Sequence, residues 1–210
     1  MNTLISKLRF LGSEIILGTL IAVLSVGTAM GSYQGSMADS DQNKYEIQGM
    51  QALNDGNTAY LEANQNLSQD FTYYDNWYTN LDANPDNAQY YLEMMSDDLA
   101  TLATSENMDE AAWDQYETSI FADANQLFDR SEKSFELATA YDEKGDQLQL
   151  VVLFAALGLA FAAWASLLGE DSNLRPVFAL MAILTLVIAL ATYFTIPAIP
   201  AIDIPPSPFQ

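Results

Sequence analysis

The sequence predicts an all-α membrane protein with three transmembrane helices and an extracytoplasmic antiparallel helical bundle or coiled-coil stalk. Apolar residues crowd into three blocks, at 15–30, 148–168 and 177–196, and most acidic residues lie between the first two blocks. No segment shows the alternation of apolar and polar residues that is typical of a half-buried strand. We therefore expect almost no sheet.

Each apolar block is long enough for a membrane span, since a bilayer core about 30 Å thick needs about 20 apolar residues in a helix. Residues 148–168 and 177–197 supply that length without a charge. Residues 13–33 are a weaker candidate because they include Gly, Ser and Thr, and with Lys7 and Arg9 before them they also resemble a signal peptide. We expect a retained span, with a cleaved signal peptide as the alternative.

The Lys and Arg residues beside the spans predict the orientation in the cell membrane, because short cytoplasmic segments are enriched in them. Lys7 and Arg9 precede the first span, Arg175 lies between the second and third, and neither residue type follows the third. We expect the N-terminus inside, and the acidic region and C-terminus outside. The predicted segments are a cytoplasmic arm (1–12), a span (13–33), the acidic helical domain (34–147), a span (148–168), a cytoplasmic loop (169–176), a span (177–197) and a Pro-rich outer tail (198–210).

The acidic region carries 24 Asp and Glu against 4 Lys and Arg, which accounts for 20 of the 21 net negative charges of the chain. Such a surface repels nucleic acid and attracts cations and basic partner surfaces. The segment 39–43 resembles the start of an EF-hand loop, but Lys44 and Met50 stand where Gly and Glu are needed. We therefore predict no metal site. Weak divalent cation binding by acidic clusters stays open as an alternative, at Asp97, Asp98, Asp109 and Glu110.

The residue types that are absent exclude several kinds of chemistry. The chain has no Cys and no His, so it cannot build Cys/His metal sites or a His-dependent nucleophilic triad from its own residues. No ionisable residue lies deep in a predicted span, which argues against a pump or a selective channel. We predict no catalytic residue, no cofactor and no enzymatic activity.

Three helices are expected in the acidic region. The first has a seam at alternating four- and three-residue spacing, followed by a helix start at Asn84 and Pro85. A second helix runs to about Thr104, and a third starts near Met108 and continues through Gly145 into the second span. The predicted seam of the first helix is Leu53, Asn57, Tyr60, Asn64, Leu67, Phe71, Tyr74, Tyr78 and Leu81.

Three features are candidate contacts with a partner. Small residues every four positions let helix backbones approach closely, either within this chain or against another subunit. Aromatic residues that fall off the predicted seams are expected on an outer face, and two prolines three apart in the tail share an edge of a polyproline II helix. The candidates are Gly27, Gly31, Gly35, Tyr73, Trp77, Tyr90, Phe121, Pro197 and Pro200.

The run YDEKGDQLQLVVLFAA at 141–156, with the short loop and apolar span that follow, resembles the C-terminal pair of spans in a loose group of uncharacterised prokaryotic membrane proteins. Those proteins also have one N-terminal span and an exterior helical segment. The resemblance implies the layout of the chain but no activity and no functional residues.

The sequence therefore favours a non-enzymatic structural or accessory subunit that scaffolds a larger membrane assembly. The expected partners are other membrane protein subunits, or further copies of the chain, within the lipid bilayer. The alternative is an extracytoplasmic binding or sensing module that acts on a neighbouring membrane protein. A cavity lined by polar and aromatic groups in the outer domain would favour that alternative.

Overall fold

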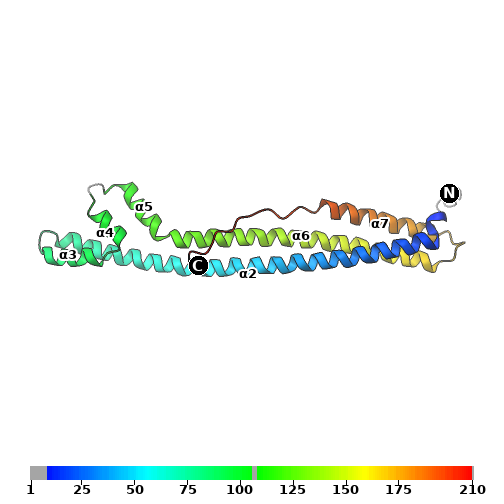
Figure 1. Ribbon diagram of the computed structural model, residues 1–210, viewed down its shortest axis with the longest axis horizontal. Helices are drawn as coiled ribbons and strands as arrows, with labels where there is room; N and C mark the ends of the chain where they lie inside the picture. Colours follow the sequence, from blue (N-terminus) through cyan, green and yellow to red (C-terminus); the bar gives the residue numbers. More distant parts are fainter. Residues whose placement is uncertain (1–8, 106–107, 210) are drawn as a thin grey trace. The chain divides into compact units, whose positions relative to one another are not determined.

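The computed structural model describes residues 9–105 and 108–209, and within them it contains helices and no strand, as predicted (Figure 1). Lys7 and the side chain of Arg9 lie outside the described part. Three helices, α2, α6 and α7, are long and apolar enough to cross a membrane. The elements are a 3-10 helix η1 (Arg9–Gly12) and the α-helices α2 (Glu14–Asn80), α3 (Pro85–Met94), α4 (Asp97–Ala103), α5 (Glu110–Ile120), α6 (Ala122–Leu167) and α7 (Arg175–Thr195).

The chain forms two compact units. The first, which we call the membrane unit, comprises Met1–Glu46 and Glu136–Ile202. The second, which we call the aromatic unit, comprises Ile47–Phe135 and Asp203–Gln210. Helices α2 and α6 contribute to both units, and α6 stays helical through Gly145, as predicted.

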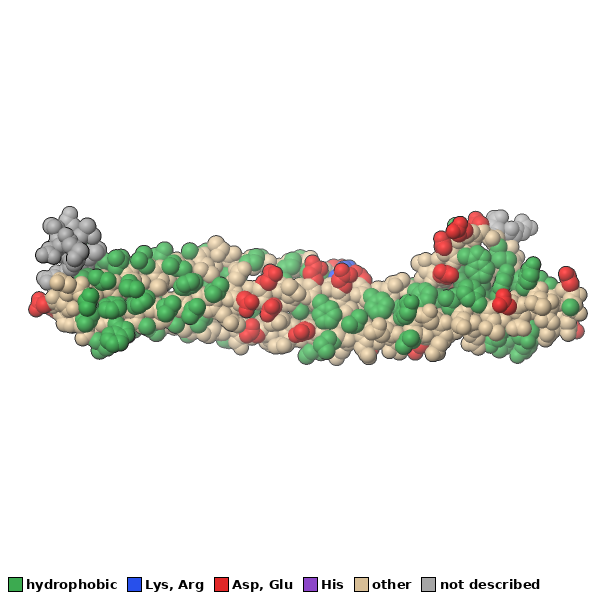
Figure 2. All heavy atoms as spheres, turned by 180° about the vertical axis from the view of Figure 1, so that it is seen from behind, with side chains coloured by type: hydrophobic (Ala, Val, Ile, Leu, Met, Phe, Trp, Pro, Cys, Tyr) green, Lys and Arg blue, Asp and Glu red, His purple; other side chains and the backbone are tan. Residues whose placement is uncertain are grey.

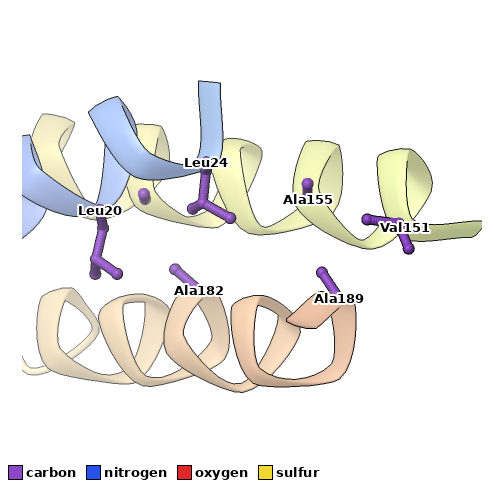
Figure 3. Packing of buried hydrophobic residues seen from close by; sticks show 7 residues of the cluster. Leu20, Leu24, Val151, Ala155, Ala182 and Ala189 are labelled. Carbon is purple, nitrogen blue, oxygen red and sulfur yellow. The ribbon is translucent and has the colours of Figure 1, made fainter. Parts of the chain in front are cut away.

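In the membrane unit, α2, α6 and α7 pack through leucines and small residues. Leu24 is fully buried between the alanines of the two other helices (Figure 3). Alanine side chains let helix backbones approach closely, and small residues at contacts are typical of membrane-spanning helices. Hydrophobic side chains cover the outside of the spans on the face drawn in Figure 2. The buried cluster consists of Leu20, Leu24, Val151, Ala155, Ala162, Ala182 and Ala189.

In the aromatic unit, the first part of the α2 contact face consists of small residues, and the predicted seam is wrong by one position there, whereas its Leu67 and Tyr74 do pack against the core. Gly49, Ala52, Gly56 and Ala63 are buried, whereas Leu53 is 41% exposed. A Cβ at Gly49 or Gly56 would lie 2.9 Å from a phenylalanine ring of α6. Because the backbones approach this closely, large side chains do not fit at the seam and lie beside it.

Two predicted helices are each broken once. The second divides into α3 and α4 at Met95–Ser96, because Ser96 caps the start of α4 and accepts from the amide of Leu99. The third divides into α5 and α6 at Phe121, whose φ of −92° and ψ of 4° interrupt the helix. The predicted helix start at Asn84 is correct, since its side chain accepts from the amide of Asn87.

The end of the Pro-rich tail lies on α6 within the aromatic unit. Arg130 Nη1 donates to the carbonyl oxygen of Pro205 at 2.6 Å, and Gln126 Nε2 donates to that of Pro206 at 3.0 Å. These contacts satisfy two backbone carbonyls of a segment that has no helical partners of its own. The end of the tail is thus held by hydrogen bonds from its own chain.

Candidate partner-binding surface

The aromatic unit has a small core that joins α4 and α5 to the end of α2. Leu99 is fully buried, and Tyr116 is 4% exposed. Half-buried aromatic rings from α2 and α5 surround them, and the rings of Tyr74 and Trp113 meet edge to face with centroids 5.6 Å apart. The core residues are Met95, Leu99, Leu102, Ala103 and Tyr116, with Leu67, Tyr73, Tyr74, Trp77, Leu92, Ala100, Ala112, Trp113 and Ile120 around them.

A buried carboxylate on α2 holds this core together. Asp70 is 5% exposed and accepts three hydrogen bonds from two other elements. The backbone N–H of Ser96 donates to Oδ1 at 2.9 Å, the Ser96 hydroxyl donates to Oδ2, and the Tyr116 hydroxyl donates to Oδ2 at 2.7 Å. These bonds connect α2 to the start of α4 and to the middle of α5. These hydrogen bonds satisfy the buried carboxylate oxygens and give Asp70 a structural role.

The environment of Tyr116 keeps its phenol neutral. Burial raises the pKa of Tyr116 above its ordinary value, and the hydrogen bond to Asp70 and the charge of that carboxylate raise it further. A phenolate beside a buried carboxylate would be repelled by it. The donor hydroxyl that Asp70 requires is therefore present throughout the physiological pH range.

Two open hollows lie in the aromatic unit, and Asp98 lines both. One, of about 410 Å³, lies between α4 and α5 and is lined by polar groups that include Thr101, Gln115 and Ser119. The other, of about 340 Å³, is lined by Asp70, Tyr73 and Ser96 among others. Ser119 Oγ donates to Asp98 Oδ2 at 3.3 Å. Across residues 9–105 and 108–209, no group of three His, Cys, Asp or Glu side chains could hold a metal ion.

A row of large apolar side chains along α2 remains exposed. Leu53, Tyr60, Phe71 and Tyr78 are 41%, 47%, 37% and 66% exposed. They lie on one line along the helix because their separations of 7 and 11 residues are close to whole numbers of turns. Rings from other elements border the row, since Tyr60 lies 5.2 Å from Phe121 between ring centroids and Phe71 lies 5.9 Å from a tryptophan of α5. We call these four residues the aromatic row.

The surroundings of the aromatic row are acidic. No Lys, Arg or His occurs between Lys44 and Arg130 in the sequence. Figure 2 shows hydrophobic side chains gathered beside the α4–α5 segment, with Asp and Glu side chains around them. A surface that is apolar at its centre and acidic at its rim is complementary to an apolar patch surrounded by Lys and Arg.

The three candidate glycines, Gly27, Gly31 and Gly35, have different surroundings in the structure. Gly31 packs against α6 of the same chain, where a Cβ would lie 2.8 Å from Val152 Cγ2, and Gly35 lies beside Leu148. A large side chain at Gly31 would therefore disturb the chain's own packing. Gly27 has open space where a Cβ would be. Of the alternatives that the sequence left open, packing within the chain is the observed role of Gly31 and Gly35.

The candidate aromatics are also divided. Tyr73 and Trp77 are half-buried against the core of the aromatic unit, and Phe121 is half-buried where α5 ends. The expectation that they occupy an outer face is thus wrong for these three, while Tyr90 is 55% exposed on α3. For Tyr73 and Trp77 the reason is the register error in α2, whereas Phe121 is half-buried at the break between α5 and α6. In the tail, Pro197 and Pro200 are both exposed.

Sequence reasoning missed the Asp70 cluster, although one of its signals is local. Ser96 is followed by Asp97 and Asp98, which is typical of a helix start with acidic residues in the first turn. The partnership with Asp70, 26 residues earlier, has no such local signal.

The fold defines an all-helical protein with three helices that can cross a membrane and a separate aromatic unit. Comparisons of the chain with protein-family models, with curated proteins and with solved structures find no match. What the chain does must therefore be inferred from its own residues and their geometry.

Proposed function

We propose that this protein is a non-enzymatic structural or accessory subunit that anchors in the cell membrane and scaffolds a larger assembly. The aromatic row is the observation that carries the proposal. Its four large apolar side chains lie on one line of α2 and remain exposed although the unit has a core of its own. Exposed apolar surface that is lined up along an element and bordered by polar groups is typical of a protein interface.

The proposed topology has the N-terminus in the cytoplasm and the aromatic unit outside. The Lys and Arg residues near the spans favour this orientation. Three crossings also require the region between the first two spans and the tail after the third to lie on the same side. The hydrogen bonds from Gln126 and Arg130 to the tail support this requirement.

The chemistry of the aromatic row and its acidic rim favours a partner other than a second copy. Residues 34–147 carry a large excess of negative charge, so two copies would repel each other at close range. A subunit that presents an apolar patch with Lys and Arg around it gains both apolar burial and opposite charge. We therefore propose a basic surface of another membrane or outer protein as the partner.

Co-purification tests the proposal through two matched double variants. Leu53→Ser with Tyr78→Ser removes two members of the aromatic row. Ile47→Ser with Leu61→Ser removes two exposed apolar side chains that lie about a quarter turn or more around α2 from the row. The protein is extracted in a mild detergent from its native membrane, and partners are quantified by mass spectrometry. We expect a stoichiometric partner with the wild type and the control variant, and its loss with the row variant. A lone chain in all three preparations would refute the proposal.

The second candidate is an extracytoplasmic binding or sensing module, which the two hollows beside Asp98 favour. Their lining of carboxylate, hydroxyl, amide and aromatic groups suits a small ligand with a cationic amine. Fluorescence of Trp113, which lies in this unit, would then change saturably when amine ligands are added, and Asp98→Asn would abolish the change. No saturable response across a panel of amines would argue against this second function.

A further inference from the structure

The membrane unit contains two hollows that meet at one residue. An open cleft of about 660 Å³ has a mixed polar and apolar lining, and a smaller hollow of about 180 Å³ has an almost wholly apolar one. Tyr193 lines both. The cleft is lined by Tyr33, Gln34, Met37, Ala38, Asp41, Tyr141, Lys144, Leu148, Tyr193, Ile196, Pro197 and Ala198. The apolar hollow is lined by Val23, Leu24, Gly27, Met30, Gly31, Val151, Ala155, Leu186, Ala189, Leu190 and Tyr193.

The two hollows follow each other along the same three helices. On α2 the lining of the apolar hollow ends at Gly31 and the lining of the cleft begins at Tyr33. On α6 Val151 lines the apolar hollow, and Leu148, one helical turn away, lines the cleft. Gln34 Nε2 donates to the Tyr193 hydroxyl at 3.4 Å where the two linings meet. The hollows therefore form one site with a polar and an apolar end.

The apolar end of this site is shorter than one leaflet of a bilayer and fits within it. Seven residues of α7 separate Leu186 from Tyr193, which corresponds to about 10 Å of helix length. One leaflet of the hydrocarbon core is about 15 Å thick. The cleft volume also lies in the range of known ligand pockets. The apolar end can thus hold part of an acyl chain while the polar end lies at headgroup level.

The polar end carries one charge of each sign. Lys144 and Asp41 both line the cleft and are both half-buried, and within residues 9–105 and 108–209 neither forms an ion pair. Tyr33, Tyr141 and Tyr193 line the same cleft, and tyrosine is enriched at the membrane–water interface of membrane proteins. A ligand with a phosphate and an ammonium group would pair with both charges.

We propose that this site binds a single phospholipid with a zwitterionic, amine-bearing headgroup. The phosphate contacts Lys144 and the tyrosine hydroxyls, the ammonium contacts Asp41, and part of one acyl chain lies in the hollow beside Gly27. A headgroup with net negative charge fits less well, because four further acidic residues lie close by in the sequence. These are Asp39, Asp142, Glu143 and Asp146.

Gly27 allows a specific test because it lines the apolar hollow, and a Cβ at this position would have no neighbour within 4 Å. Gly27→Leu would place a large side chain in the apolar end, and its Cβ would meet no protein atom within 4 Å. Gly18→Leu is the matched control, since Gly18 lies on the same helix, has the same open space, and does not line the hollow. Both substitutions have the same effect on helix propensity.

The experiment is native mass spectrometry of the full-length protein in detergent with dioleoyl-phosphatidylethanolamine added, and with dioleoyl-phosphatidylglycerol in a parallel series. We expect one tightly retained phosphatidylethanolamine per chain in the wild type and in Gly18→Leu, and none in Gly27→Leu. Lys144→Gln should weaken retention about tenfold, since it removes a charge-assisted contact to phosphate.

Three results would overturn the proposal. The first is equal retention by the Gly27 and Gly18 variants, and the second is equal retention of the two lipids. The third is a dimer, or a second protein, that occupies the hollow in place of lipid and is lost with Gly27→Leu. Because the aromatic row plays no part in these measurements, failure here leaves the proposed scaffold function unaffected.

Discussion

Replacing Asp70 with Ala should loosen α4 and α5 while leaving the membrane unit intact. Asp70 is the acceptor for the Ser96 N–H, the Ser96 hydroxyl and the Tyr116 hydroxyl, and alanine offers no acceptor to any of them. Tyr116 is only 4% exposed, so its hydroxyl loses a buried partner. Ser96 lies nearer the surface, where water can do so.

The size of the effect follows from these two environments. An unsatisfied buried hydroxyl costs about 1–3 kcal/mol, and the exposed bonds of Ser96 contribute about 1 kcal/mol more. The free energy of opening this unit should therefore fall by about 2–4 kcal/mol, which corresponds to a roughly 30- to 1,000-fold change in the opening equilibrium.

Hydrogen–deuterium exchange of the full-length protein measures this local opening directly. Amides of α4 and α5 should exchange faster in Asp70→Ala by that factor, and those of α7 should not change. Asp75→Ala is the control, because it removes an exposed carboxylate from the same helix. Equal protection of α4 in the two variants would show that Asp70 does not hold the unit together.

Three further predictions follow. Single cysteines in this cysteine-free chain should react with an impermeant reagent outside intact cells at Asp97→Cys but not at Ser172→Cys, and the reverse pattern would invert the topology. Gly56→Leu should lower local stability by about 1–3 kcal/mol, because a Cβ there would lie 2.9 Å from a ring of α6. Asn57→Leu should not, because Asn57 is exposed, and denaturant titration followed by circular dichroism compares the two variants. The raised pKa of Tyr116 means that its neutral form stabilises the fold fully below the ordinary phenol pKa near 10, and that this contribution is lost as the pH rises further. Tyr116→Phe should abolish that alkaline loss in exchange measurements, and an unchanged loss would exclude Tyr116 as its source.

The spans and several helix ends were predictable because their causes are local. Twenty consecutive apolar residues have few places to lie other than in a membrane, and α7 begins two residues before the predicted span at 177. Asn84 and Pro85 define the start of α3 through a side-chain cap and a fixed φ, both of which depend on adjacent residues alone.

The contact face of α2 was not predictable in the same way. Leu53 and Ala52 each belong to a series of residues three and four positions apart, so either series could form the contact face. Choosing the series with the larger apolar residues selects that of Leu53. The smaller residue is buried because Gly49 and Gly56 bring α6 so close that phenylalanine rings rest on the α2 backbone. Whether a small or a large residue lies at the contact depends on the distance between the helices, which belongs to the pair and not to either sequence segment.

The sequence predicted that an aromatic surface exists but not which residues form it. Aromatic enrichment indicated a possible interface, but the register of α2 decides which rings are exposed, and so Tyr78 is exposed while Trp77 is half-buried. The buried role of Asp70 depends on a contact with Ser96 that is distant in sequence, and among so many acidic residues nothing distinguishes this one before the fold is known.

Photocrosslinking in the native membrane tests the scaffold proposal most directly. A photoreactive phenylalanine analogue is introduced in place of Tyr78 in the aromatic row, and in place of Leu61 as a control of similar exposure. We predict a discrete adduct with a second polypeptide from position 78 and none from position 61. No protein adduct at position 78, or equal adducts at both positions, would contradict the proposal that the aromatic row binds a partner.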